Sequence, residues 1–308
     1  MKRASNNIIL IKIFNNEQHL SKLSNCFRPM KSFINYIALL LILTFTSCTD
    51  VIDVEVPTEE PRLVVEASIN WEKGTVGNNQ TIILSKSTPF FDTNGNVPVS
   101  GASVTITNND DGSFFEFNDN NDGTYSTNTF VPVLNNSYTL EIITENETFI
   151  AQETFMPVVD ILDTYQSKDK LDPDALEVNF DFQDPVEVTN YYYIKFKEQA
   201  DLLPSLLDFK DEFVNGNLIS VFNEREKDED INQEEYAPGD VVDMELIGIS
   251  KRYYEYIQIL INQSESGGPF DTTPVALRGN CTNETNPDMY AYGYFRLTQV
   301  SKASYTFE

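Results

Sequence analysis

Histidine is almost absent from this chain of 308 residues, and cysteine and basic side chains are scarce. The single histidine is His19, and the three cysteines are Cys26, Cys48 and Cys281. Imidazole is the commonest general base and zinc ligand in proteins, so the chain beyond residue 19 holds no Ser-His-Asp or Cys-His machinery. With 21 basic and 48 acidic side chains, the formal net charge is −27 at pH 7. Because such a surface repels nucleic acids and anionic lipid surfaces, we expect neither as a partner. The acidity has two alternative explanations, which are the solubility of a surface protein and the binding of cations.

A hydrophobic segment at residues 30–48, MKSFINYIALLLILTFTSC, has the parts of a secretory signal peptide. Lys31 supplies a positive charge, residues 33–45 form an apolar run, and small residues precede Cys48. The run is shorter than the ~20 residues of a permanent membrane-spanning helix. A cysteine directly after small residues is typical of a bacterial lipoprotein box, in which the thiol is acylated and the chain is cut before it. We therefore predict a signal peptide at residues 30–47 and lipidation at Cys48. A plain secretory signal is the alternative.

Residues 1–29 precede a signal peptide that is already complete when read from Met30. We therefore predict that residues 1–29 are an over-extended start of the reading frame. A genuine long n-region is the alternative. Residues 48–61 are acidic and hold two prolines, which favours an extended tether. Residues 1–47 contain six basic side chains and one acidic, so the remainder has a net charge of about −32. Cys281 then has no intramolecular disulfide partner. We expect it to be a small buried residue rather than a nucleophile.

Short β-type runs separated by turn sequences fill residues 62–156. The runs are β-branched, aromatic or alternating, and turns are predicted at 94–95, 111–112 and 122–123. About seven short strands in some ninety residues favour an N-terminal immunoglobulin-like β-sandwich. Residues 118–123, NDNNDG, approximate the opening of a calcium loop, but Asn118 replaces the leading aspartate and Thr129 replaces the bidentate glutamate. We therefore interpret 118–123 as a hairpin turn.

Residues 157–308 form a predicted second β-rich, α+β domain, because Pro157 ends the last strand of the first. Strands are expected at 176–182, 190–196, 241–246, 289–297 and 303–307, with helical structure at 202–213. A prominent helix is predicted near 250–263, capped by Ser250, with Tyr253 and Tyr256 on its apolar face. Core packing of Tyr253, Tyr254 and Tyr256 is favoured over a sugar-binding stripe. The whole chain is thus predicted to be mainly β.

Several motifs give the chain a family likeness. In order they are RLVVEA (62–67), VSGASV (99–104), DGTY (122–125), YTL (138–140), GGPF (267–270) and YGYF (292–295). With the lipoprotein box they resemble the outer-membrane lipoproteins of Bacteroidota grouped as domain of unknown function 4249 (DUF4249). The resemblance implies an outer-membrane lipoprotein, held by lipid at Cys48, that works beside a SusC-like TonB-dependent receptor. It supplies no catalytic residue set.

Two functions are therefore expected. The first is a non-enzymatic, surface-exposed accessory or substrate-capturing partner of a TonB-dependent nutrient transporter. The second is a structural or adhesive cell-surface protein. A glycosidase with two catalytic carboxylates is a third hypothesis, although the sequence singles out no pair. No cofactor, metal or catalytic residue is predicted. The ligand, the receptor interface and the oligomeric state are left open, and the tyrosines at 191–193 are one possible binding surface.

Overall fold

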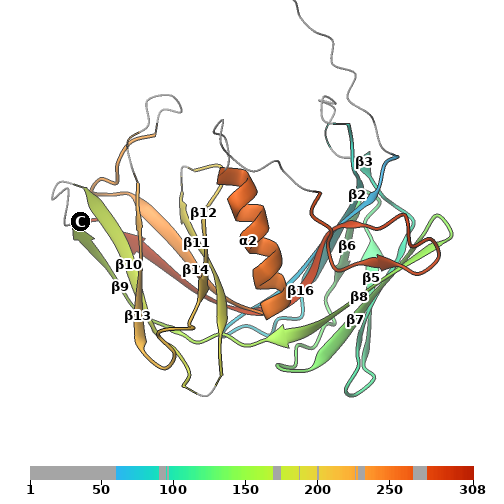
Figure 1. The fold of residues 1–308 in the computed structure, drawn as a ribbon, viewed down its shortest axis with the longest axis horizontal. Helices are drawn as coiled ribbons and strands as arrows, with labels where there is room; N and C mark the ends of the chain where they lie inside the picture. The colour runs from blue at the N-terminus through green and yellow to red at the C-terminus, as the bar shows by residue number, and fades with distance from the viewer. Residues whose placement is uncertain are drawn as a thin grey trace, which may run out of the picture. The chain divides into compact units, whose positions relative to one another are not determined.

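Strands dominate the part of the chain that the structure describes (Figure 1). This computed structural model describes residues 60–89, 95, 97–168, 175–186, 188–199, 201–225, 227, 233–265 and 276–308. Cys48, the predicted signal peptide and over-extended start, and nearly all of the predicted tether lie outside these residues. All described residues belong to one compact unit, residues 58–308. Among them, no helix combines the length and apolar character needed to cross a bilayer.

Eight strands form a closed ring of hydrogen-bonded neighbours. In ring order, each bonded to the next and the last to the first, they are β16 (Tyr292–Thr306), β1 (Leu63–Glu72), β2 (Gln80–Lys86), β6 (Thr124–Thr127), β5 (Phe114–Asp119), β4 (Ser103–Asn108), β7 (Ser137–Thr144) and β8 (Glu147–Met156). Two short strands add to it: β3 (Val97–Pro98) pairs with β2, and β15 (Thr282–Asn283) pairs with β8. Alternating residues such as Val65, Ala67 and Ile69 point inward and form the core.

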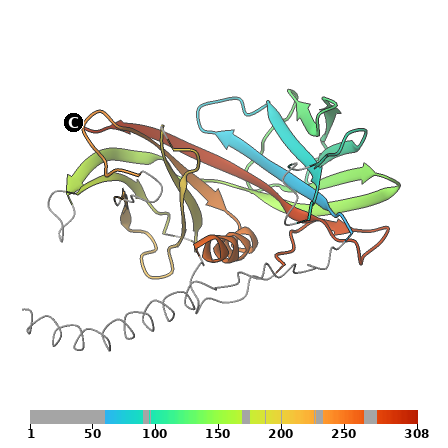
Figure 2. The same ribbon diagram turned by 90° about the horizontal axis from the view of Figure 1, so that it is seen from above.

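The last strand, β16, closes the ring and continues out of it. It pairs in parallel with β1 over nine residues and with β8 over two. Further along, β16 pairs antiparallel with β14 (Val241–Ile249). Figure 2 shows β16, in red, running from the strands of the ring to those that follow residue 157. One strand therefore belongs to both parts of the fold.

Three layers of secondary structure pack around the C-terminal half of β16. Next to β14 lie β11 (Tyr191–Glu198) and the edge strand β12 (Ser205–Lys210). A separate three-stranded sheet, in the order β13 (Leu218–Glu224), β10 (Leu176–Gln183), β9 (Ile161–Lys168), packs on one face. The interface is rich in aromatic side chains, including Phe180, Phe182 and Phe196. Aromatic side chains bury large areas, so this interface is the second core of the fold.

Helix α2 (Lys251–Glu265) covers the other face of β11 and β14. The Ser250 hydroxyl accepts a hydrogen bond from the Tyr253 amide at 3.1 Å, which confirms the predicted cap. Tyr253, Ile257 and Ile261 face the sheet and are buried, at the spacing of one helix face. The predicted helix near 250–263 and the packing role of Tyr253 are confirmed.

Two details of the predicted fold are wrong. Residues 202–213 were expected to be helical, but they contain β12, because pairing with β11 overrides the local leucine-rich pattern. Two strands were expected, at 289–297 and 303–307, but the chain forms one continuous strand there, β16, which runs from Tyr292 to Thr306. The immunoglobulin-like description of residues 62–156 is not confirmed, since those strands close a ring only with β16. The mainly β class holds.

A candidate binding surface at two paired loops

Two loops of the three-layered part lie side by side and are fixed to each other. Loop 184–190 joins β10 to β11, and loop 211–217 joins β12 to β13. The Gly216 amide donates to Asp184 Oδ2 at 2.9 Å, and the Asn190 amide donates to Asp211 Oδ2 at 2.8 Å. Gly216 has φ of +76°, and a Cβ there would lie 3.0 Å from Val186. We call these two segments the paired loops.

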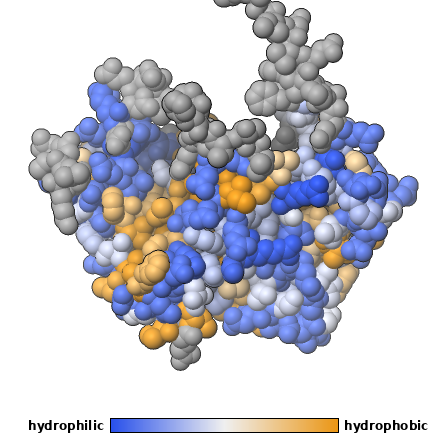
Figure 3. Space-filling view, in the orientation of Figure 1, coloured by the Kyte–Doolittle hydropathy of each residue, from blue (hydrophilic) through white to orange (hydrophobic). Residues whose placement is uncertain are grey.

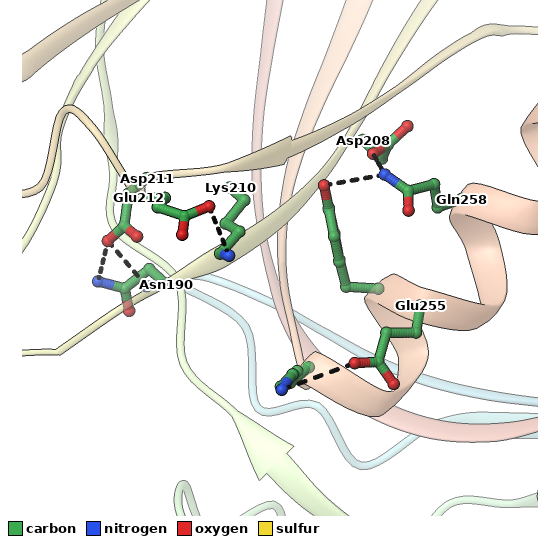
Figure 4. Close-up of polar contacts among 9 residues, drawn as sticks. Asn190, Asp208, Lys210, Asp211, Glu212, Glu255 and Gln258 are labelled. Carbon is green, nitrogen blue, oxygen red and sulfur yellow. Dashed lines mark hydrogen bonds and ion pairs between the residues drawn. The ribbon is translucent and has the colours of Figure 1, made fainter.

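Two buried carboxyl groups hold the paired loops together. Asp184 is 1% exposed and Asp211 is 0% exposed. The Tyr192 hydroxyl donates to Asp184 Oδ1 at 2.6 Å, whereas Asp211 Oδ1 has no hydrogen-bond partner. Figure 4 shows the Asn190 and Asp211 side chains pointing toward each other. A backbone turn of this kind is rigid only while these polar groups stay satisfied.

The ionisation of these groups follows from their burial. Burial raises the pKa of the Asp211 carboxyl, and the neighbouring Asp184 charge raises it further. Burial also raises the pKa of the Tyr192 hydroxyl, which donates to Asp184 and stays protonated. The raised pKa values favour the protonated forms of Asp211 and Tyr192 in the folded protein, where both side chains take part in the hydrogen bonds that hold the loops in place.

A small cavity of about 120 Å³ adjoins the network. Its walls come from the segment that links the ring to β9, from loop 184–190 and from the ends of β11 and β14; they include Pro157, Val159, Asn190, Tyr191 and Ile249. This volume suits a few atoms rather than a whole nutrient molecule. The cavity therefore makes a poor substrate pocket.

Large apolar side chains project from the outer side of the paired loops. Val186, Val188 and Phe213 are 73%, 60% and 92% exposed, and Leu218 at the start of β13 is 58% exposed. Figure 3 shows hydrophobic side chains gathered at the lower left of the view, where these loops lie. Clustered exposed apolar side chains are typical of protein–protein contact sites. We call these four residues the apolar patch.

On the opposite side of β12, contacts to α2 are polar. Gln258 donates to Asp208 at 3.3 Å and to the Tyr254 hydroxyl at 3.2 Å, as Figure 4 shows for Gln258 and Asp208. Tyr254 also packs against Tyr191, with ring centroids 5.1 Å apart. These contacts hold the edge strand β12 against helix α2 and thereby stabilise the loop that follows β12.

The structure also locates most of the residues that the sequence singled out. Cys281 is buried, and burial raises the pKa of its thiol to about 12, so the expected packing role is confirmed. Residues 118 and 119 end β5, and residues 120–123 form the turn to β6. Asn121 has φ of 65° and its amide donates to Asp119, which confirms the predicted hairpin. Of the tyrosines at 191–193, Tyr192 and Tyr193 are buried and unavailable as a surface.

Sequence reasoning missed the buried carboxyl pair. Asp184 lies between the strands expected at 176–182 and 190–196, and Asp211 fell in the stretch expected to be helical. The two aspartates are far apart in the sequence and meet only because β10, β11, β12 and β13 bring their loops to the same end. An aspartate directly after a strand and before proline was the one available signal.

The fold and this surface together define a strand-rich protein with a preformed loop surface. The family model named "Domain of unknown function (DUF4249)" matches residues 49–304, and the chain belongs to this family. None of the curated proteins compared with the chain matches it.

Solved structures show only distant likeness. A cytokine receptor complex is 8% identical, with a TM-score of 0.27, covering 78% of this chain and 94% of that chain. The FN1-FN3 domains of chicken CNTN1 are 11% identical, with a TM-score of 0.25, covering 64% and 63%. A two-domain fibronectin type-III segment from chicken tenascin is 11% identical, with a TM-score of 0.19, covering 62% and 91%. At these scores the likeness carries no argument.

Proposed function

We propose that this chain is a non-enzymatic outer-membrane lipoprotein, anchored through Cys48 and facing the cell surface, that serves a SusC-like TonB-dependent nutrient transporter as an accessory or substrate-capturing partner. The lipoprotein box and the family likeness support the anchor and the type of partner. The apolar patch on the paired loops supports docking to another protein. This patch is the observation that carries the proposal.

Preorganisation makes the patch suitable for docking. The loops that carry it are tied by the Asp184 and Asp211 hydrogen bonds, so little conformational freedom is lost on binding. A highly exposed aromatic ring such as Phe213 is the kind of side chain that fills a partner's pocket and supplies much of the binding energy. We therefore assign the receptor contact to the apolar patch.

Affinity purification from gently solubilised native outer membranes tests the proposal. A C-terminally tagged wild-type chain should recover one TonB-dependent receptor in about equal amount, and Phe213→Ser should recover at least about tenfold less, as expected for an interface hot spot. Phe114→Ser is the matched control, because Phe114 is also an exposed phenylalanine, 61% exposed, but lies on β5 of the ring. It should recover the receptor as the wild type does.

Two other results of this purification would count against the proposal. Recovery of the tagged chain alone would favour the structural or adhesive function. Equal recovery by Phe213→Ser and wild type would move the contact away from the paired loops.

Lipid attachment has its own test. Cells fed an alkyne-labelled fatty acid should label the wild-type chain, and Cys48→Ser should lose the label and leave the membrane fraction, since the acyl chains supply the membrane affinity. Labelling that persists in Cys48→Ser would contradict the anchor.

A further inference from the structure

Arg296 is a buried guanidinium that has no anionic partner among the residues that the structure describes. It lies on β16, is 5% exposed, and its Nε and Nη1 atoms are buried with no hydrogen-bond acceptor. A guanidinium stays charged at every physiological pH. Buried charges in proteins are normally paired, because the lost hydration must be replaced. An unpaired arginine in so acidic a chain therefore calls for an explanation.

The surroundings of Arg296 are aromatic and cationic. Its guanidinium lies 5.3 Å from the centre of the Tyr253 ring of α2, which gives partial compensation by a cation–π contact. Lys195 of β11 lies 5.5 Å from the Tyr193 ring centre, and the Tyr193 and Tyr253 rings are in edge contact. Burial lowers the pKa of Lys195, and the Arg296 charge lowers it further. Positive potential thus accumulates between α2 and the sheet.

The nearby carboxylates are used elsewhere. Glu245 pairs with Lys195 at 3.4 Å and Lys302 at 3.5 Å. Glu153 accepts hydrogen bonds from Ser250 and from Tyr294. Both carboxylates have donors of their own, which leaves the Arg296 donors unmatched.

The β1 residues beside Arg296 are more exposed than Arg296 itself. Ser68 is its neighbour in the β1–β16 pairing and is half-buried, and Glu66 and Asn70, on the same face of β1, are exposed. Glu66 forms no ion pair with Arg296 in the structure.

We propose that Arg296 is the centre of an oxyanion-binding site between α2 and β1, which takes a carboxylate, phosphate or sulfate group of a small ligand. The planar guanidinium presents N–H donors in a fork that matches such groups. Ser68, its neighbour in the β1–β16 pairing, carries a hydroxyl that can add a donor. The Tyr253 ring forms one wall. This site is independent of the paired loops, so its failure would leave the proposed receptor partnership untouched.

Ligand-dependent stability of the full-length protein in detergent is the test. Inorganic phosphate, sulfate and acetate are each titrated against chloride at constant ionic strength while the thermal unfolding midpoint is recorded. One or more of the three oxyanions should raise the wild-type midpoint in a saturable way, and the one that acts at the lowest concentration identifies the preferred group. Arg296→Gln should shift the half-saturating concentration at least tenfold upward or abolish the effect.

Two further variants sharpen the result. Arg278→Gln is the matched control, because Arg278 is an exposed arginine stacked on Tyr290 at 4.0 Å, and it should behave as the wild type does. Glu66→Gln should lower the half-saturating concentration by removing a repelling charge. If Arg296→Gln does not fold, the Arg296 Nε–H resonance of ¹⁵N-labelled wild type should move on addition of the active anion.

The proposal is overturned if none of the three anions changes the wild-type midpoint beyond the chloride control, or if Arg296→Gln responds as the wild type does. The proposal is also overturned if the anions raise the unfolding midpoint of the Glu66→Gln variant but not that of the wild type, because Glu66 would then be the partner of Arg296.

Discussion

Asp184 and Asp211 are buried carboxyl groups that both accept hydrogen bonds from the Asn190 side chain, and burial together with the Asp184 charge raises the pKa of Asp211. The raised pKa of Asp211 means that the folded state keeps a proton which the unfolded chain releases above about pH 4. The free energy of unfolding should therefore fall as the pH rises from about 4 through the raised pKa, by about 1.4 kcal/mol for each unit of difference between the two pKa values.

Asp211→Asn tests this at the residue scale. The amide is uncharged at all pH values and can donate to Asp184, so the variant should lose this part of the pH dependence and gain stability relative to wild type at pH 8. Urea unfolding at pH 5 and pH 8 measures it. Asp243→Asn, an exposed aspartate on β14, is the control and should keep the wild-type profile. A steeper fall for Asp211→Asn than for wild type would contradict the idea.

Single residues were predictable where their role is local. Cys281 was predictable as buried because a lone cysteine without a disulfide partner usually packs as a small hydrophobe. The 118–123 turn was predictable because Asn and Gly favour its backbone angles. Asp211 and Arg296 were not, since their burial depends on which strands and helix come to cover them.

At the scale of elements, the β1–β16 seam depends on one glycine. Gly293 has φ of +84°, and a Cβ there would lie 2.1 Å from the Val65 carbonyl oxygen. Gly293→Ala should therefore force the two strands apart and lower the free energy of unfolding by more than about 3 kcal/mol, since backbone strain and a steric clash add. Gly74→Ala is a matched control with the same φ, but nothing lies near its Cβ.

Gly74→Ala should cost only about 1–2 kcal/mol, the strain of the left-handed conformation. Urea denaturation of both variants gives the comparison. Similar losses for the two would show that the close approach to Val65 is not decisive.

The cap of α2 is a second element-scale test. Ser250 accepts from the Tyr253 amide and donates to Glu153 on β8, so it both starts the helix and joins it to the ring. Ser250→Ala should lower the free energy of unfolding by about 1–2 kcal/mol. Lys251→Ala, which removes only an exposed ion pair with Glu255, should change it by less than about 0.5 kcal/mol. Thermal or urea unfolding distinguishes the two.

Elements with a clear period were predicted well. The alternation in β10 and the apolar face of α2 are visible in the sequence, and both elements form as expected. β12 was missed because its hydrophobic residues do not alternate strictly and its structure comes from pairing with β11. Strands β9 and β13 were missed for a similar reason: their outer faces are polar or mixed and carry little pattern.

At the scale of the whole molecule, the order of the strands limits how the chain can be divided. The sequence suggested separate regions at 62–156 and 157–308, but β16 lies between β1 and β8 in the ring. A fragment of residues 62–156 should therefore remain largely unfolded, because the edges of β1 and β8 stay unpaired. Circular dichroism and amide exchange measure this.

The control is the same fragment fused to residues 292–306 through a flexible linker, which should restore protected amides in β1. A well-protected fragment without the added strand would contradict the role of β16 and support an independent domain.

The parallel arrangement of β1 and β16 also determines how the protein resists a pull. A load between the N-terminal end of β1 and the C-terminal end of β16 acts along both strands in opposite directions, so the bonds across their nine-residue pairing are loaded in shear at the same time. Antiparallel hairpins pulled from their open end separate one bond after another. Among the described strands this pairing is the longest, so it should be the last to open under such a load.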